Sequence, residues 1–142
     1  MNRDLIVAQL RADEGEVLHA YKDSNGYWTI GVGRLIDQRR GGGITKEESD
    51  YLLNNDIDRT YADLIRAFPW MKDLDDIRQN VLLNMAFNLG IDGLRGFKLT
   101  LAYVRGGHYE LAAGEMLKSL WAKQVGARAQ RLARMMRTGV AA

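Results

Sequence analysis

Glycine is concentrated in one short part of this chain, and that concentration limits what the part can form. Seven of the 15 glycines lie within residues 15–43. Aromatic and β-branched residues on both sides of the turn sequence DSNG, at 23–26, predict a β-hairpin. After Gly31 the sequence is short, polar and rich in glycine, so we expect at most one more short strand.

The sequence on either side of this part has helical periodicity. Apolar residues recur on one side of residues 4–14, and Gly15 follows as a helix stop. Thr45 and Glu48 form a capping box at the start of a long helical pattern, which Pro69 ends. We therefore expect one helix before the glycine-rich part and a longer one after it.

The second half of the chain predicts shorter helices separated by glycines. Residues 77–89 are apolar nearly all round, which is typical of a buried central helix, and further helices are expected at about 109–120 and 127–137. The whole sequence predicts a mostly helical α+β fold in a single domain, 1–142, with an N-terminal helix at 1–14, a β-lobe at about 15–43, a connecting helix at about 45–68 and a helical lobe at about 69–142. The crevice between two lobes is a common place for a ligand.

Composition excludes several classes of protein. The chain has 142 residues and no cysteine, which excludes a disulfide-stapled mini-protein and any metal or redox site built from thiolates. No apolar run reaches the roughly 18 residues that a membrane-spanning helix needs. The apolar stretch near the N-terminus is too short for a secretory signal, so we expect the chain to be made and folded in the cytoplasm.

The two halves of the chain differ in charge. Residues 1–71 hold 9 Lys and Arg against 12 Asp and Glu, whereas residues 72–142 hold 11 against 6. Four arginines recur at every third position of the last helical pattern, namely Arg128, Arg131, Arg134 and Arg137. This basic region is either a solvated helix face or a surface attracted to a polyanion.

Few residues could perform acid–base or nucleophilic chemistry. His19 and His108 are the only imidazoles, and neither has a carboxylate or a nucleophile at an evident partner spacing. No serine lies in a nucleophile elbow, and the GVG sequence at 31–33 lacks the third glycine of a dinucleotide-binding loop. Carboxylates are the remaining candidates.

Glu14 and Asp23 are the carboxylates of most interest. Glu14 ends the first helical pattern on its apolar side, whereas Asp23 heads a turn with free backbone N–H groups. Two carboxyl groups in such different surroundings within one short segment fit the acid–base pair of a glycoside hydrolase. The alternative is that Glu14 is a solvated helix-end residue and that Asp23 only forms the turn.

The segment that holds both carboxylates, DEGEVLHAYKDSNGYWTIGVGRL at 13–35, resembles the active-site segment of the T-even phage lysozymes, the muramidases of glycoside hydrolase family 24. In the family pattern a glutamate before glycine is followed by a YxD aspartate and a TIGxG strand, and Glu14, Asp23 and Thr29 match it. Later segments, including GGITKEESDYLLNNDI, NMAFNLG, KSLW and RTG, are similar too, so the resemblance covers nearly the whole chain and implies a lysozyme-like two-lobe fold.

The resemblance implies hydrolysis of the β-1,4 bond between N-acetylmuramic acid and N-acetylglucosamine in bacterial peptidoglycan, which lyses the host cell. Glu14 would protonate the leaving glycosidic oxygen. Asp23, with the hydroxyl of Thr29, would hold and activate a water on the opposite face of the sugar. This inverting geometry needs about 6.5–9.5 Å between the two carboxyl groups. No metal or cofactor is implied.

Four further positions match residues with a role in the family. Leu35, Phe87 and Thr100 would line the sugar groove, and core packing is the alternative for Leu35 and Phe87. Arg128 aligns with an arginine that reaches the catalytic glutamate in the family.

The chain also departs from the family pattern. Arg34 replaces a histidine, which makes an ion pair at this position less sensitive to pH. Glu115 stands where an asparagine that faces the groove is expected. The stretch at 36–44 is shorter than in the T-even enzymes, which implies a lower cleft wall.

Other functions fit parts of the sequence. A nucleic-acid-binding helical protein would explain the basic C-terminal part but not the segment 13–35. A catalytically silent peptidoglycan-binding module would share the fold, and a lytic transglycosylase would cleave the same bond without water. We expect a monomer that acts on peptidoglycan in the periplasm after a holin-type membrane protein releases it from the host cytoplasm, without binding nucleic acid or inserting stably into the membrane.

Overall fold

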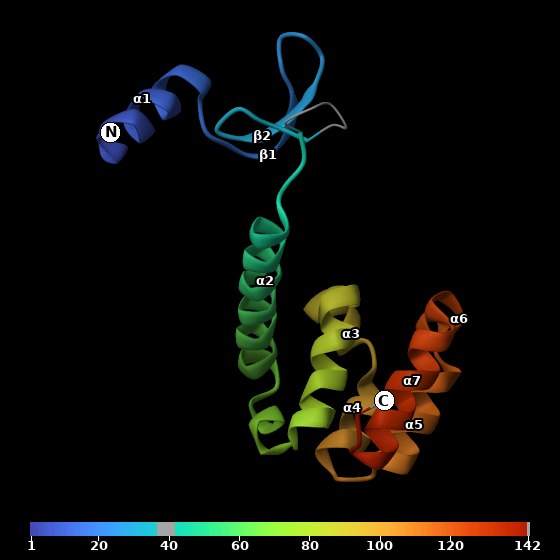
Figure 1. The fold of residues 1–142 in the computed structure, drawn as a ribbon. Helices are drawn as coiled ribbons and strands as arrows, with labels where there is room; N and C mark the ends of the chain where they lie inside the picture. Colours follow the sequence, from blue (N-terminus) through green and yellow to red (C-terminus); the bar gives the residue numbers. More distant parts are fainter. Residues whose placement is uncertain (37–41, 142) are drawn as a thin grey trace. The chain divides into compact units, whose positions relative to one another are not determined.

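The computed structural model describes residues 1–36 and 42–141, and Figure 1 shows its elements. The chain divides into two compact units, Met1–Leu52 and Leu53–Ala142, which we call the N-terminal unit and the helical unit. Helix α2 (Lys46–Ala67) runs through the boundary between them and ends just before Pro69, as the sequence predicts. Among the described residues, no helix combines the length and the apolar character needed to cross a membrane.

The N-terminal unit combines one helix with one small sheet. Its elements are α1 (Arg3–Glu14), β1 (Val17–Lys22), β2 (Trp28–Gly31) and β3 (Arg34–Leu35), followed by the first turns of α2. The strands form an antiparallel sheet in the order β1-β2-β3, which confirms the predicted hairpin and the one further short strand. The predicted shortening at 36–44 falls largely on residues 37–41, which lie outside the described residues.

Polar contacts join the sheet to the start of α2. Arg34 donates from Nη1 to the Gly43 carbonyl at 3.0 Å, and its Nη2 lies 2.7 Å from Oε2 of Glu48. The Glu48 N–H donates to Oγ1 of Thr45 at 3.1 Å, and the Thr45 N–H donates to Oε1 of Glu48 at 3.3 Å. This reciprocal pair confirms the predicted capping box. The hydrogen bond from the Thr45 backbone and the charge of Arg34 lower the pKa of Glu48 below 4.5.

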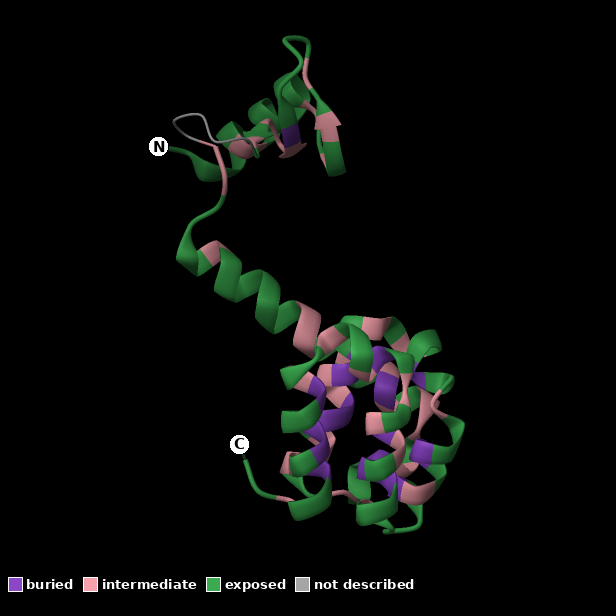
Figure 2. Ribbon diagram, turned by 90° about the vertical axis from the view of Figure 1, so that its right-hand side faces the viewer, coloured by how far each residue is buried: buried purple, intermediate pink, exposed green. Residues whose placement is uncertain are grey.

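The helical unit contains the hydrophobic core. After α2 it consists of a 3-10 helix η1 (Pro69–Asp73), α3 (Asp76–Arg95), α4 (Lys98–Arg105), α5 (Tyr109–Lys118), α6 (Leu120–Val125) and α7 (Ala127–Thr138). The buried apolar side chains of the described residues all lie between Leu64 and Met136, and Figure 2 shows them in purple among the packed helices. Val81, Leu82 and Met85 of α3 are fully buried, which confirms the predicted central helix.

Two helices have bounds that differ from the prediction. Helix α3 continues past residue 89 to Arg95, with a kink at Gly90 where φ is 74° and ψ is 165°. The helix predicted at 109–120 is interrupted at Ser119, which ends α5 and begins α6. The Ser119 hydroxyl donates to the Met116 carbonyl at 2.7 Å and accepts from the Ala122 N–H at 3.1 Å. One serine thus satisfies backbone groups of both helices, so the break costs little.

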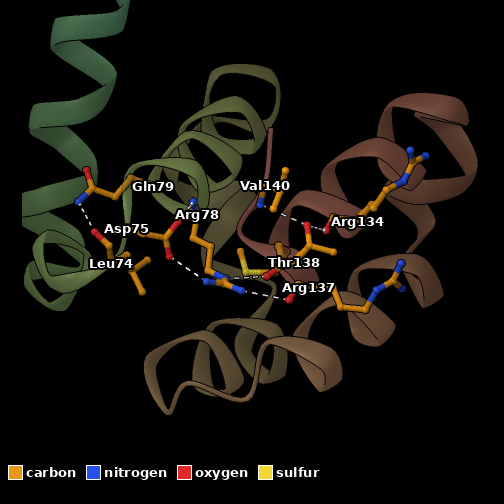
Figure 3. Close-up of polar contacts among 9 residues, drawn as sticks. Leu74, Asp75, Arg78, Gln79, Arg134, Arg137, Thr138 and Val140 are labelled. Carbon is orange, nitrogen blue, oxygen red and sulfur yellow. Dashed lines mark hydrogen bonds and ion pairs between the residues drawn. The ribbon is translucent and has the colours of Figure 1, made fainter. Parts of the chain in front are cut away.

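Arg78 of α3 closes the C-terminal end of α7. Its guanidinium donates from Nε to the Met136 carbonyl at 2.7 Å and from Nη2 to the Arg137 carbonyl at 3.0 Å (Figure 3). Oδ2 of Asp75 lies 2.9 Å from Nη1, and the ring of Tyr109 lies 3.6 Å from the guanidinium carbon. Because the last carbonyls of a helix have no partner within it, these contacts stabilise the end of α7.

Candidate active site

Glu14 is the last residue of α1, and its carboxylate lies against the turn between β2 and β3. A Cβ atom on Gly33 would be 2.8 Å from Oε2 of Glu14, so the carboxylate rests on the bare backbone of this glycine. Gly33 has φ of +66°, a conformation that residues with a side chain rarely adopt. The glycine therefore satisfies two needs at once, a turn of this shape and the close approach of Glu14.

The surroundings of Glu14 differ from the expectation in one respect. The sequence places Glu14 on the apolar side of α1, but its side chain is exposed, and α1 has no buried residue. The physical reason is that the apolar side of α1 is not covered: Leu5, Ile6 and Leu10 are exposed as well. The acid candidate is thus open to a large substrate.

Asp23 organises the turn between β1 and β2. Its Oδ1 accepts hydrogen bonds from the N–H groups of Asn25 at 2.9 Å and Tyr27 at 2.8 Å. Its carbonyl accepts from the Gly26 N–H at 3.0 Å, and its own N–H donates to the Tyr27 carbonyl at 2.8 Å. These bonds confirm Asp23 as the turn former and fix its carboxyl group. Within the described residues its Oδ2 accepts no hydrogen bond.

Thr29 and Leu35 are paired on two adjacent strands of the sheet. Thr29 of β2 pairs with Tyr21 of β1 and with Leu35 of β3. Its side chain is only 3% exposed, and its hydroxyl donates to the Tyr27 carbonyl at 3.1 Å. Leu35 is half-buried. Sheet pairing therefore brings the predicted water-holding residue beside a predicted groove residue.

The helical unit carries the other predicted groove residues. Phe87 of α3 is 44% exposed, although it lies beside buried core residues, so core packing does not account for it. Thr100 of α4 is 3% exposed, and its hydroxyl forms no hydrogen bond with the described residues. Thr100 and Glu115 line the same cavity of about 510 Å³, which we call the Thr100 pocket; Phe97, Lys118 and Trp121 also line it.

Glu115 does not face this pocket as a free charge. Its Oε1 accepts from Nζ of Lys118 at 2.8 Å. This hydrogen bond and the charge of Glu115 raise the pKa of Lys118 above 10.5. Where the family pattern has the neutral amide of an asparagine, this chain therefore has an ion pair between Glu115 and Lys118.

Arg128 of α7 is held by α3. Its Nε and Nη2 donate to Oδ1 of Asn84 at 2.9 and 2.7 Å, and Nη2 also donates to the Asn84 carbonyl at 3.2 Å. Among the other arginines of the basic helix, Arg137 lies 3.9 Å from Glu110, whereas Arg131 and Arg134 are exposed and form no side-chain contact of this kind with the described residues. The four arginines are therefore not equivalent.

Sequence reasoning missed two residues of this site. Asn84 lies 44 positions from Arg128, and no local pattern links them. Gly33 belongs to the GVG sequence and to the TIGxG pattern, but neither pattern displays its positive φ or the approach of Glu14 to its backbone.

The site candidates are divided between the two units. The N-terminal unit holds Glu14, Asp23, Thr29 and Leu35, and the helical unit holds Phe87, Thr100 and Arg128. The histidines have no catalytic setting, because His19 is exposed and His108 stacks edge-on against Tyr103. Within residues 1–36 and 42–141, no three His, Cys, Asp or Glu side chains are arranged to hold a metal ion.

Comparison with known proteins finds relatives over most of the chain. Residues 11–137 match the family model described as Phage lysozyme. The chain is 31% identical over 157 residues to the "Probable T4-type lysozyme 1" of Dictyostelium discoideum, covering 92% of each protein. It is 32% identical over 125 residues to the endolysin of Salmonella phage P22, covering 82% of this chain and 80% of that protein. A match to the pre-baseplate central spike protein Gp5 of Enterobacteria phage T4, at 31% identity, covers 92% of this chain and 27% of Gp5.

Proposed function

Because the chain belongs to the phage lysozyme family, we propose that it is an endolysin-type muramidase, a glycoside hydrolase that cleaves the β-1,4 bond between N-acetylmuramic acid and N-acetylglucosamine in peptidoglycan and so lyses a bacterial host. The family match at 11–137 includes every residue to which we give a role. The observation that carries the assignment is the carboxylate of Glu14 resting on Gly33, in the turn that follows the strand of Thr29.

Glu14 acts as the general acid. As the bond between the sugar C1 and the glycosidic oxygen breaks, Glu14 gives its proton to that oxygen, which leaves as a hydroxyl group. Its exposure supports this role, because a polymer must reach the proton. The contact with Gly33 limits the directions in which the carboxyl group can turn.

Asp23 and Thr29 act on the attacking water. Two backbone N–H groups occupy Oδ1 of Asp23, which leaves Oδ2 to accept a proton from water. The Thr29 hydroxyl donates to the Tyr27 carbonyl, so its oxygen is directed to accept a hydrogen bond from the same water. Attack from the face opposite the leaving group inverts the configuration at C1, as expected for carboxyl groups about 6.5–9.5 Å apart.

The remaining predicted residues bind the substrate. Leu35, beside Thr29, supplies an apolar contact to a sugar ring, and the exposed ring of Phe87 supplies another. In the Thr100 pocket the buried hydroxyl of Thr100 has no protein partner among the described residues, so a substrate group can bind it without displacing an existing bond.

Arg128 is a positioning residue for the acid, as the family pattern implies. Its hydrogen bonds to Asn84 support this role, because they fix a long side chain that is otherwise free to rotate.

The protein acts without a metal or cofactor, as a monomer. It reaches the periplasmic peptidoglycan from the host cytoplasm with the help of a holin-type membrane protein, and it neither binds nucleic acid nor inserts stably into the membrane.

Digestion of purified peptidoglycan in water enriched in oxygen-18 tests the reaction. Hydrolysis places one solvent oxygen at the new reducing end, which mass spectrometry detects as a product two mass units heavier than the product formed in ordinary water. Proton NMR of the fresh product then reports the configuration at C1, where an α-anomer indicates inversion.

Two results would contradict the proposal. An anhydro-sugar without solvent oxygen would assign the chain as a lytic transglycosylase. Binding without any product would assign it as a silent peptidoglycan-binding module.

A further inference from the structure

A second cavity of the helical unit lies outside the site described above. It has a volume of about 510 Å³, which is within the range of small-molecule sites, and we call it the Trp70 pocket. Phe68 and Trp70 line it from one side, and Leu101 of α4 lines it from another. All of its lining residues belong to the helical unit.

The uncharged lining of the Trp70 pocket is apolar. Phe68 and Trp70 are half-buried, with ring centroids 5.9 Å apart and ring planes tilted by 52°. The other uncharged residues that line the pocket are Ala67, Pro69, Leu101 and Ala102. Hydrocarbon groups of a ligand can therefore lie against this lining and leave water.

Three cations also line this pocket. They are Arg95, Lys98 and Arg105, and no acidic residue lines it with them. All three are exposed, and within the described part of the chain none forms an ion pair or a side-chain hydrogen bond. Arg78 of the same unit, in contrast, pairs with Asp75. The three charges are therefore available to anions outside the protein.

The spacing of the cations indicates how many anionic groups they can meet. Lys98, Leu101 and Arg105 lie on one face of α4, because they are three and four residues apart. Lys98 and Arg105 are separated by about 10 Å along the helix axis, at 1.5 Å per residue. Charges spread over this distance match a surface with several anionic groups better than they match one small anion.

Two kinds of surface carry many phosphates, namely nucleic acids and membranes with anionic lipids. Nucleic acids bind through aromatic rings on which bases stack, whereas Phe68 and Trp70 are half-buried and tilted against each other. Tryptophan beside arginine and lysine is typical of contact with a membrane surface, where phosphates lie directly above hydrocarbon. The combination of unpaired cations with an apolar lining therefore favours a membrane.

We infer that the Trp70 pocket is a docking site for a membrane surface that contains anionic phospholipids. Arg95, Lys98 and Arg105 bind lipid phosphates, while Phe68 and Trp70 contact the glycerol and the first methylene groups below them. The contact is peripheral and reversible, because it uses one face of the helical unit and inserts no helix. It is separate from the catalytic residues and does not depend on the proposed reaction.

Cosedimentation of the whole chain with lipid vesicles tests this inference. One set of vesicles consists of phosphatidylcholine, and the other contains equal parts of phosphatidylcholine and the anionic phosphatidylglycerol. The pocket variant carries Arg95→Gln and Arg105→Gln. The matched control carries Arg131→Gln and Arg134→Gln, which removes the same charge from exposed arginines outside the pocket.

Wild type should bind the anionic vesicles and leave the neutral vesicles unbound. The pocket variant should bind the anionic vesicles about 30-fold more weakly, as expected for two basic residues near an anionic membrane surface. The control should bind as wild type does. A second measurement uses lipids with brominated acyl chains, which quench tryptophan fluorescence on contact; wild type should be quenched, and Trp70→Phe should lose most of that quenching.

Three results would overturn the inference: equal binding of wild type to both kinds of vesicle, equal losses in the pocket and control variants, or quenching that Trp70→Phe leaves unchanged. The same three proteins are also titrated with glycerol phosphate and with a single-stranded oligonucleotide. If wild type ignores the vesicles but binds one of these ligands, and only the pocket variant loses that binding, the pocket belongs to a free phosphate or to a nucleic acid instead.

Discussion

At the scale of single residues, Gly33 matters through what it lacks. Its bare backbone accepts the carboxylate of Glu14, and a Cβ atom there would lie 2.8 Å from Oε2. Gly31 has nearly the same φ, +67°, but nothing lies within 4 Å of a Cβ at that position. An alanine at either position strains the backbone, but only an alanine at Gly33 also displaces Glu14. Comparing the two substitutions therefore separates the two effects.

We expect Gly33→Ala to lower kcat about 10- to 100-fold, because a small displacement of a catalytic group has an effect of that size. Gly31→Ala should lose a similar free energy of unfolding, about 1 kcal/mol for a side chain in the left-handed region, and keep its activity. Rates of reducing-end release and denaturation curves of both variants measure this. Equal losses of activity would mean that strain alone is responsible.

Asn84 and Arg128 offer a second prediction at this scale. If Arg128 positions the acid and Asn84 holds Arg128, then Asn84→Ala and Arg128→Ala should each lower kcat/KM about tenfold, the equivalent of one charge-assisted hydrogen bond. The double variant should be little worse than either single variant, because both changes remove the same contact. The kinetics of the four proteins measure the coupling, and additive losses would count against a shared role.

At the scale of elements, the start of α3 and the end of α7 depend on one ion pair. Asp75 caps α3 by accepting from the Arg78 N–H at 3.0 Å, and it holds the guanidinium that closes α7. Partial burial would raise the pKa of Asp75, but the hydrogen bonds and the charge of Arg78 outweigh it and lower the pKa below 3.8. Asp75 therefore stabilises the fold as an anion.

The sign of the shift gives a pH dependence. A carboxyl group whose pKa is lowered by folding contributes its full stabilisation at a pH above its pKa in the unfolded chain, here 3.8. That contribution is lost as the pH falls through the lower pKa of the folded protein. Asp75→Asn keeps the helix cap but not the charge. In urea unfolding, the variant should have a lower free energy of unfolding than wild type at neutral pH. This difference should shrink below pH 3.8. Asp73→Asn, an exposed neighbour, is the control, and a difference that is constant with pH would contradict the account.

The elements show which structural features a sequence can predict. The bounds of α1, the hairpin, the capping box at Thr45 and the end of α2 before Pro69 follow from neighbouring residues, and each prediction is confirmed. The break at Ser119 was missed, because a serine inside a helical pattern gives no sign that it will cap the next helix. The closure of α7 by Arg78 joins residues 58 positions apart, and only the packed structure shows it.

The same limit applies to the candidate site. Glu14, Asp23 and Thr29 lie in one segment of sequence, so their spacing carried the prediction. The contact between Asn84 and Arg128 joins two separate segments, and no periodicity in the sequence indicates it.

At the scale of the whole molecule, the two units differ in how much core they have. All buried apolar residues among those described belong to the helical unit, whereas Thr29 is the one buried residue described in the N-terminal unit. A small sheet with so little buried apolar surface is expected to open more readily than a packed helical core. The candidate acid and base thus lie in the less stable unit.

Hydrogen exchange followed by mass spectrometry measures that difference. Backbone N–H groups of α3 and α7 should exchange at least about tenfold more slowly than those of β1 and β2. Equal protection of the two units would show that the small sheet is as stable as the core.

The most direct test of the central claim is the rate of reducing-end release from purified peptidoglycan by wild type, Glu14→Gln and Asp13→Asn. The last two variants lose one negative charge at adjacent exposed positions of α1. If Glu14 is the general acid, Glu14→Gln should be at least about 100-fold slower, while Asp13→Asn keeps wild-type activity. Wild-type activity of Glu14→Gln, or an equal loss in both variants, would contradict the assignment.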